Sequence, residues 1–132
     1  MAGLQKINSQ AIKFVERKSK KEFFRKPTVH YGSGECRNTY AAKHGHVTQA
    51  KVVIDKNFSK EPYRLMIPPI LVHELRENLG FQHGEGIQEA HMNARRLEQK
   101  VLRNMGKAKT DAFYSLAYLL GYSTNTREKY RR

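Results

Sequence analysis

The sequence lacks the features that mark disulfide-bonded, secreted or membrane-spanning proteins. It has one cysteine, Cys36, and no tryptophan, so an internal disulfide and a cysteine-rich zinc site are excluded. It has no run of about 18 apolar residues. Its first residues are interrupted by lysine and glutamine and lack the apolar core of a signal peptide. We therefore expect a protein of a reducing compartment such as the cytoplasm.

Acidic residues are also scarce, because 12 Asp and Glu face 25 Lys and Arg and leave a formal net charge of +13. Residues 1–27 carry +6, residues 122–132 carry +3, and residues 28–121 carry the remaining +4. Basic arms on a more balanced core favour a polyanionic partner, namely DNA, RNA or an acidic protein surface. The alternative is a charge that serves solubility only. No helix-turn-helix, zinc-finger or RNP-type motif separates DNA from RNA.

We expect the partner-binding side chains to lie in two exposed arms, a basic N-terminal helix over 1–27 and a basic tail over 122–132. The candidates are Lys18, Lys20, Lys21, Arg25, Lys26, Arg127, Lys129, Arg131 and Arg132. Phe23 and Phe24 lie among these cations and have rings that can stack on bases. Two phenylalanines of the core are the simpler interpretation.

The patterning predicts an α+β fold with three to four helices and a small strand pair. Apolar residues at three-to-four spacing predict a helix over 4–24, ended by Pro27. Short strands are expected at 28–31 and within 46–55, whereas the polar segment 37–46 has no clear assignment.

Three further helices are expected between residues 68 and 121. Pro68 and Pro69 suit the entrance of the first, which Gly80 should end. The others are predicted over 86–105, ended by Gly106, and over 109–121.

The most informative residues are two histidines and several carboxylates within this helical region. His73 and Glu77 are four apart and share a helix face, and His91 and Glu98 are seven apart and share a face of the next helix. The segment His73-Glu74-x-x-Glu77 resembles the zinc protease helix motif, with glutamate in place of the second histidine.

Applied to this chain, that motif gives each residue a role. His73, Glu77 and His91 would hold zinc and leave one position open. Glu74 would be the base that activates water, and Glu98 would orient a ligand or be a fourth one. Arg76 or Arg95 would steady a developing oxyanion.

The same residues also allow a structural interpretation. His73 would then cap or pack its helix, and the two carboxylates would be solvated or paired with Arg76 and Arg95. His30, His44, His46 and His83 show no ligand-like partner, and Asp55 more simply caps the turn after its strand.

The wider pattern resembles a family of small bacterial and phage proteins that are metallopeptidase-like. Its strand V-x-I-D-[KR]-x-[FL], helix H-E-x-x-E, glycine and A-H-x-x-A-x-x-x-E segment correspond here to Val52–Phe58, His73–Glu77, Gly84 and Ala90–Glu98. The resemblance covers about residues 51–115 and implies a metal site with peptidase-like chemistry. A tyrosine frequent in that family four residues before the second histidine is replaced by Ile87. This replacement removes an orienting or transition-state hydroxyl, so the resemblance implies metal binding more strongly than catalysis.

Two functions follow from these observations. One is a small zinc-dependent hydrolase, most simply a peptidase. The other is a non-catalytic component of a phage particle or nucleoprotein complex, which binds nucleic acid or neighbouring subunits through its arms.

Overall fold

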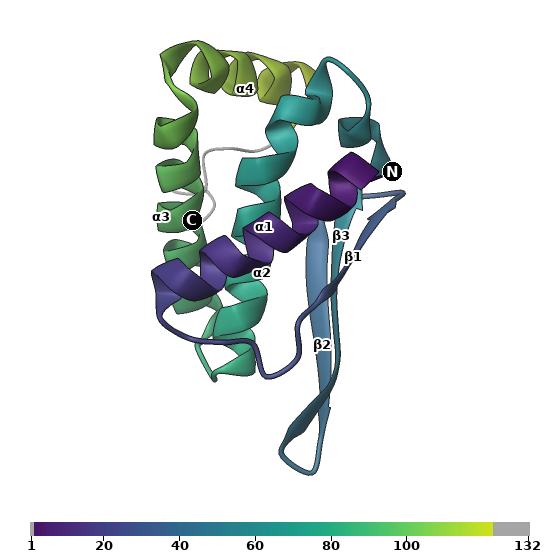
Figure 1. Ribbon diagram of the computed structural model, residues 1–132, viewed down its shortest axis with the longest axis vertical. Coiled ribbons are helices and arrows are strands. Elements are labelled where there is room, and N and C mark those ends of the chain that lie inside the picture. Colours follow the sequence, from purple (N-terminus) through teal and green to yellow (C-terminus); the bar gives the residue numbers. More distant parts are fainter. Residues whose placement is uncertain (1, 123–132) are drawn as a thin grey trace.

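The computed structural model describes residues 2–122 and has the expected α+β fold, with four helices and a three-stranded mixed sheet in that range (Figure 1). In chain order the elements are α1 (Ala2–Ser19), β1 (Thr28–Gly32), β2 (Arg37–Lys43), β3 (His46–Asp55), the short 3-10 helices η1 (Lys56–Ser59) and η2 (Tyr63–Met66), α2 (Ile67–Gln82), α3 (Ile87–Met105) and α4 (Lys107–Leu120). No helix among the described residues has the length and apolar character needed to cross a bilayer.

Helix α2 is the centre of the molecule and is covered on several sides. α1 crosses it on one side, α3 runs beside it on another, and the sheet lies against a third (Figure 1). Its apolar residues Ile70, Leu71, Leu75 and Leu79 are fully buried and form the middle of the hydrophobic core. Because α2 is covered so widely, the polar residues within it are also buried and need partners inside the protein.

The sheet has β3 in the middle, with β1 parallel to it on one edge and β2 antiparallel on the other. The predicted strand pair is β1 with β3, and Val52 and Ile54 of β3 supply buried core residues. The two-residue turn His44-Gly45 joins β2 to β3, and both of its residues have positive φ, as tight hairpin turns require.

Strand β2 has no counterpart in the sequence prediction. Six of its seven residues are exposed, and Asn38 is half-buried. Its sequence, Arg-Asn-Thr-Tyr-Ala-Ala-Lys, therefore lacks the alternation of apolar and polar residues that marks a half-buried strand.

Helix α1 is part of the core and differs from the exposed arm that we expected. Leu4, Ala11 and Val15 are buried against the rest of the protein, while the lysines and arginines up to Lys26 are exposed. The helix ends at Ser19, well before Pro27, because Lys20 adopts a left-handed conformation with φ of 56°. This conformation stops a helix without proline.

The two neighbouring phenylalanines have different environments. Phe23 is buried in the core, as expected, but the same expectation for Phe24 is wrong. Phe24 is 67% exposed and stacks on His83, with ring centroids 4.4 Å apart.

Gly80 does not end α2, which continues to Gln82. A Cβ at Gly80 would lie 2.9 Å from Nη1 of Arg76 and closer still to Oε1 of Glu85. These two side chains form a bidentate ion pair, with N–O distances of 3.0 and 2.8 Å, directly over the glycine. Gly80 is therefore needed because a side chain there would clash with the ion pair. The glycine with positive φ after the end of α2 is Gly84, not Gly80.

We predict that Gly80→Ala destabilises the protein, although alanine normally favours a helix over glycine by about 1 kcal/mol. The added methyl group must displace the Arg76–Glu85 pair. Urea unfolding of Gly80→Ala, Glu85→Ala and the double variant tests this. The alanine at position 80 should be unfavourable in the wild-type background and neutral or favourable once Glu85 is removed. Equal effects in both backgrounds would contradict the steric explanation.

Candidate metal centre

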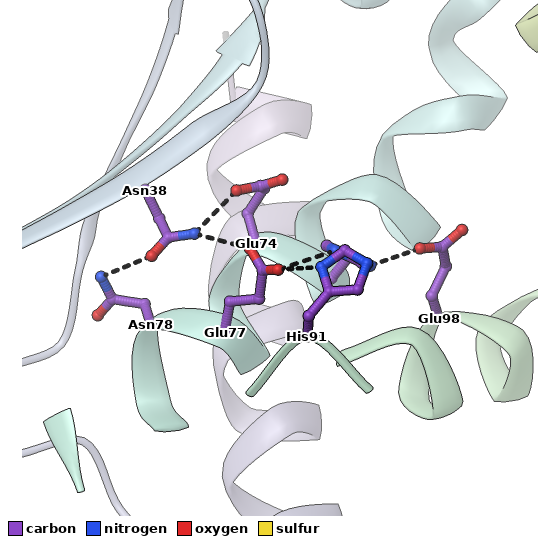
Figure 2. A network of polar contacts seen from close by, with 7 residues as sticks. Asn38, Glu74, Glu77, Asn78, His91 and Glu98 are labelled. Atoms are coloured by element: carbon purple, nitrogen blue, oxygen red, sulfur yellow. Dashed lines mark hydrogen bonds and ion pairs between the residues drawn. The ribbon is translucent and has the colours of Figure 1, made fainter. Parts of the chain in front are cut away.

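The convergence of His73, Glu77 and His91 predicted from their spacing is found in the structure. The potential ligand atoms of the three residues all lie within 4.8 Å of one another. Oε2 of Glu77 is the common point, because it lies 3.3 Å from Nε2 of His73 and 2.5 Å from Nδ1 of His91. Figure 2 shows the contact of Glu77 with the His91 ring. On α2, His73 lies one helical turn before Glu77 on the same face. Helix α3 places the His91 ring against the Glu77 carboxylate.

The donor set suits a divalent metal ion. Two imidazoles and one carboxylate are ligands that zinc accepts, with bonds of about 2.0–2.1 Å in tetrahedral sites. Ligand atoms bonded in that way lie about 3.3 Å apart. The His73–Glu77 distance matches this separation, whereas the shorter His91–Glu77 contact has to open by under 1 Å. The nitrogen atoms of the two imidazoles lie within 4.8 Å of each other and have to approach to the same separation, so the group could hold a metal ion once these side chains shift.

Glu98 extends the site on the far side of His73. Its Oε1 lies 2.6 Å from Nδ1 of His73, so the imidazole stands between two carboxylates. Figure 2 shows Glu98 reaching inward from α3. A carboxylate on the second ring nitrogen fixes the orientation of a ligating histidine and raises its basicity. Of the two roles considered for Glu98, the geometry favours orientation of His73.

Asn38 of β2 contacts both carboxylates of α2. Its Nδ2 donates to Oε1 of Glu74 at 2.9 Å and to Oε1 of Glu77 at 3.2 Å (Figure 2). Nδ2 of Asn78 in turn donates to Oδ1 of Asn38 at 3.4 Å and to the Thr39 carbonyl at 3.0 Å. These bonds hold Glu74 beside Glu77 and join the sheet to the site.

The hydrogen-bond chain continues away from the site to the segment after α1. Nε2 of Gln82 donates to Oδ1 of Asn78 at 2.7 Å and to the Arg25 carbonyl at 3.0 Å, and the Arg25 N–H donates to Oε1 of Gln82 at 3.2 Å. The sequence analysis missed Asn38, Asn78 and Gln82. The spacing of Glu74, Asn78 and Gln82, four residues apart along one face of α2, was the available signal.

The charges of the site are strongly coupled. Burial alone would raise the pKa of Glu77, but hydrogen bonds from His73 and His91 hold it at about 2. Burial lowers the pKa of His73, but Glu77 and Glu98 outweigh burial and raise it to about 10. Burial and the neighbouring Glu77 charge raise the pKa of Glu74 to about 7. A proton and a metal cation therefore compete for the same atoms of His73 and Glu77.

The site is enclosed. His73, Glu74, His91 and Glu98 are all at least nine-tenths buried, and Glu77 is the most accessible member, with 14% of its side chain exposed. Tyr122, at the end of the described chain, lies close enough that Glu98 and Glu74 add to burial in raising its pKa well above 10. Ile87 is 72% exposed at the start of α3.

Several other predicted roles can be compared with the structure. Arg76 pairs with Glu85 rather than with Glu74 or Glu77, and that pair makes it unsuited to steadying an oxyanion at the site. Asp55 caps η1 as expected, since its Oδ1 accepts from the Asn57 N–H at 3.0 Å. Among the described residues, His73, Glu77 and His91 are the cluster able to hold a metal, and His44 and His46 are not part of it.

The predicted partner-binding residues of the two arms differ in their ion pairing. The five described candidates are all exposed, and two of them, Lys21 and Lys26, also form ion pairs with Glu85 and Glu16 at 3.8 and 3.5 Å. The remaining candidates, Arg127, Lys129, Arg131 and Arg132, lie outside the described residues.

Comparisons with known protein families, with curated protein sequences and with solved structures gave no significant match. The resemblance to metallopeptidase-like proteins therefore rests on the motif residues alone, and the geometry adds a group of three side chains that could hold a metal ion.

We predict that Asn38→Ala destabilises the fold by about 1–3 kcal/mol, because it removes the shared donor of two buried carboxylates. The midpoint of urea unfolding measures the loss. Asn104→Ala, an exposed asparagine on α3, is the matched control and should stay within about 0.5 kcal/mol of wild type. A loss at position 38 no larger than at position 104 would show that Asn38 is not needed to compensate the two charges.

We also predict that the Cys36 thiol is unreactive in the folded protein. Burial raises its pKa to about 12, despite a bond from the Asp55 N–H to Sγ at 3.4 Å that favours the thiolate. Since the thiolate is the nucleophile, alkylation by iodoacetamide at pH 8 should be far slower than in urea-unfolded protein. Equal rates in the two states would contradict this assignment.

Proposed function

We propose that this protein is a zinc-dependent hydrolase with His73, Glu77 and His91 as the metal ligands and Glu74 as the general base. The observation that carries the proposal is the meeting of Nε2 of His73 and Nδ1 of His91 at one carboxylate oxygen of Glu77, inside a fold that excludes most water. Zinc in such a site supplies a Lewis acid that activates water and polarises a carbonyl group.

The residues around the ligands have separate tasks in this proposal. Glu98 holds the His73 ring by its second nitrogen, so that Nε2 faces Glu77. Asn38 holds Oε1 of Glu74 and Oε1 of Glu77 through one amide group and so fixes the distance between the base and a ligand. Glu74 accepts the proton that the attacking water loses. A peptide bond is the simplest substrate by analogy with the motif.

The second candidate is a structural metal site in a non-catalytic assembly protein. The burial of the site favours it, because a substrate must reach a carboxylate that is only 14% exposed. A structural ion would stabilise the packing of α2 against α3 without turnover. Both candidates require the same ligands and differ in the task of Glu74.

We predict that purified wild-type protein binds about one zinc ion and that His73→Ala and Glu77→Gln each remove it. Dialysis against zinc-containing buffer followed by elemental analysis measures the stoichiometry. Glu89→Gln, an exposed glutamate in the first turn of α3, is the matched control and should bind zinc as wild type does. Zinc binding that survives both ligand changes would rule out this site.

For catalysis we expect Glu74→Gln to keep zinc and the fold but to lose hydrolysis of a fluorogenic peptide library by at least about 100-fold, because only the proton acceptor is removed. Retained activity in Glu74→Gln would exclude it as the base. A zinc-loaded wild type that cleaves no peptide and is stabilised against urea by zinc would favour the structural candidate, since a ligand at 100 times its Kd adds about 2.7 kcal/mol.

A further inference from the structure

A groove with a volume of about 530 Å³ lies between the C-terminal end of α1 and the side of α3 turned away from the metal centre. Its charged lining residues are all basic, namely Lys18, Arg76, Arg96, Lys100 and Arg103. In Figure 1 the end of α1 lies over α3 in this view, and residues of both helices line the groove. The groove brings together cations from segments far apart in the sequence, which the division into terminal arms did not anticipate.

Most of the positive charge in the groove is not neutralised within the described chain. Arg76 is held by Glu85, but none of Lys18, Arg96, Lys100 and Arg103 forms an ion pair with a carboxylate of residues 2–122. Arg96, Lys100 and Arg103 are spaced by four and three residues along α3, so they form a row on one face. With a rise of 1.5 Å per residue, that row extends for about 10 Å.

A row of cations in a concave surface suits an extended polyanion better than a single small anion or a flat membrane. The exposed apolar residues that a membrane surface would bind, such as Tyr118 and Leu119, lie on α4 and not in the groove. Arginine has a planar fork that matches phosphate oxygens. Phosphate groups of a nucleic-acid backbone therefore match the lining in charge and in shape.

The composition of the lining also distinguishes between forms of nucleic acid. None of the described residues that line the groove is aromatic, whereas single-strand binding relies on bases stacked on aromatic rings. The major groove of B-form DNA is wide enough to admit a helix beside the bound backbone, but that of A-form RNA is too narrow and deep. Double-stranded DNA is therefore the form in which α3 can enter the major groove, while the end of α1 stays outside the duplex and reaches a phosphate through Lys18.

We propose that the groove between α1 and α3 binds the phosphate backbone of double-stranded DNA without sequence preference. Lys18 contacts it from α1, and Arg96, Lys100 and Arg103 contact it from α3. Gln99 also lines the groove and offers an amide donor to phosphate oxygens. This function is independent of the metal centre, because α3 carries His91 and Glu98 on its opposite side.

The test is fluorescence anisotropy of the full chain with a labelled 20-base-pair DNA duplex over a series of salt concentrations. The variant is Arg96→Gln/Arg103→Gln, which removes two exposed charges of the groove. The matched control is Lys43→Gln/Lys60→Gln, which removes two exposed charges elsewhere. Zinc content and urea stability should be unchanged in both.

We expect the groove variant to bind about tenfold more weakly and its slope of log K against log salt to fall by about 1.8, corresponding to two lost phosphate contacts. The control should differ little from wild type. Equal losses in variant and control would overturn the proposal, because charge alone would then explain binding. Absence of DNA binding by wild type, or tighter binding of duplex RNA, single-stranded DNA or polyglutamate in competition, would also overturn it.

Discussion

The structure depends on the carboxylate of Glu77, whose side chain is 14% exposed and hydrogen-bonds to residues of two other elements, α3 and β2. It lies on α2, bonds to His91 of α3 and is bonded by Asn38 of β2. A carboxylate in the protein interior is unfavourable unless charges and donors surround it. The core around α2 can therefore close only when α3 and β2 are both in place. The same requirement draws a second carboxylate, a second histidine and Glu98 into one cluster, and so creates the candidate metal centre.

The helical part of this arrangement could be predicted from the sequence because its contacts are local. A spacing of four residues places His73 over Glu77, and the short connection after α2 returns α3 alongside it, so that His91 meets both. The α+β class and the core strand β3 also followed from apolar periodicity. The ends of the elements were less accurate, since Lys20 ends α1 by a backbone conformation. Gly80 was predicted to end α2, but it lies within the helix, where the Arg76–Glu85 ion pair leaves no room for a Cβ.

The parts that escaped prediction depend on contacts between distant segments. β2 has almost no buried side chain, and its contribution to the site is the amide of Asn38, which resembles any surface asparagine in the sequence. The basic groove likewise combines Lys18 of α1 with residues of α3 that lie more than seventy positions further along the chain. The distribution of charge along the sequence indicated a polyanionic partner but assigned its binding to the two terminal arms. The fold places part of this positive charge in the groove between α1 and α3.

The position of the site within a helical hairpin has a consequence for how the molecule folds. His73, Glu77, His91 and Glu98 all belong to α2 and α3, which are joined by a short turn. Closing such a short loop has a small entropic cost, whereas pairing β1 with β3, or docking α1 on α2, requires contacts across long stretches of chain. The ligand cluster can therefore assemble early, around the hairpin, and the sheet then encloses it when Asn38 arrives. An ion bound to the hairpin at that stage would act as a nucleus for folding as well as a component of the finished protein.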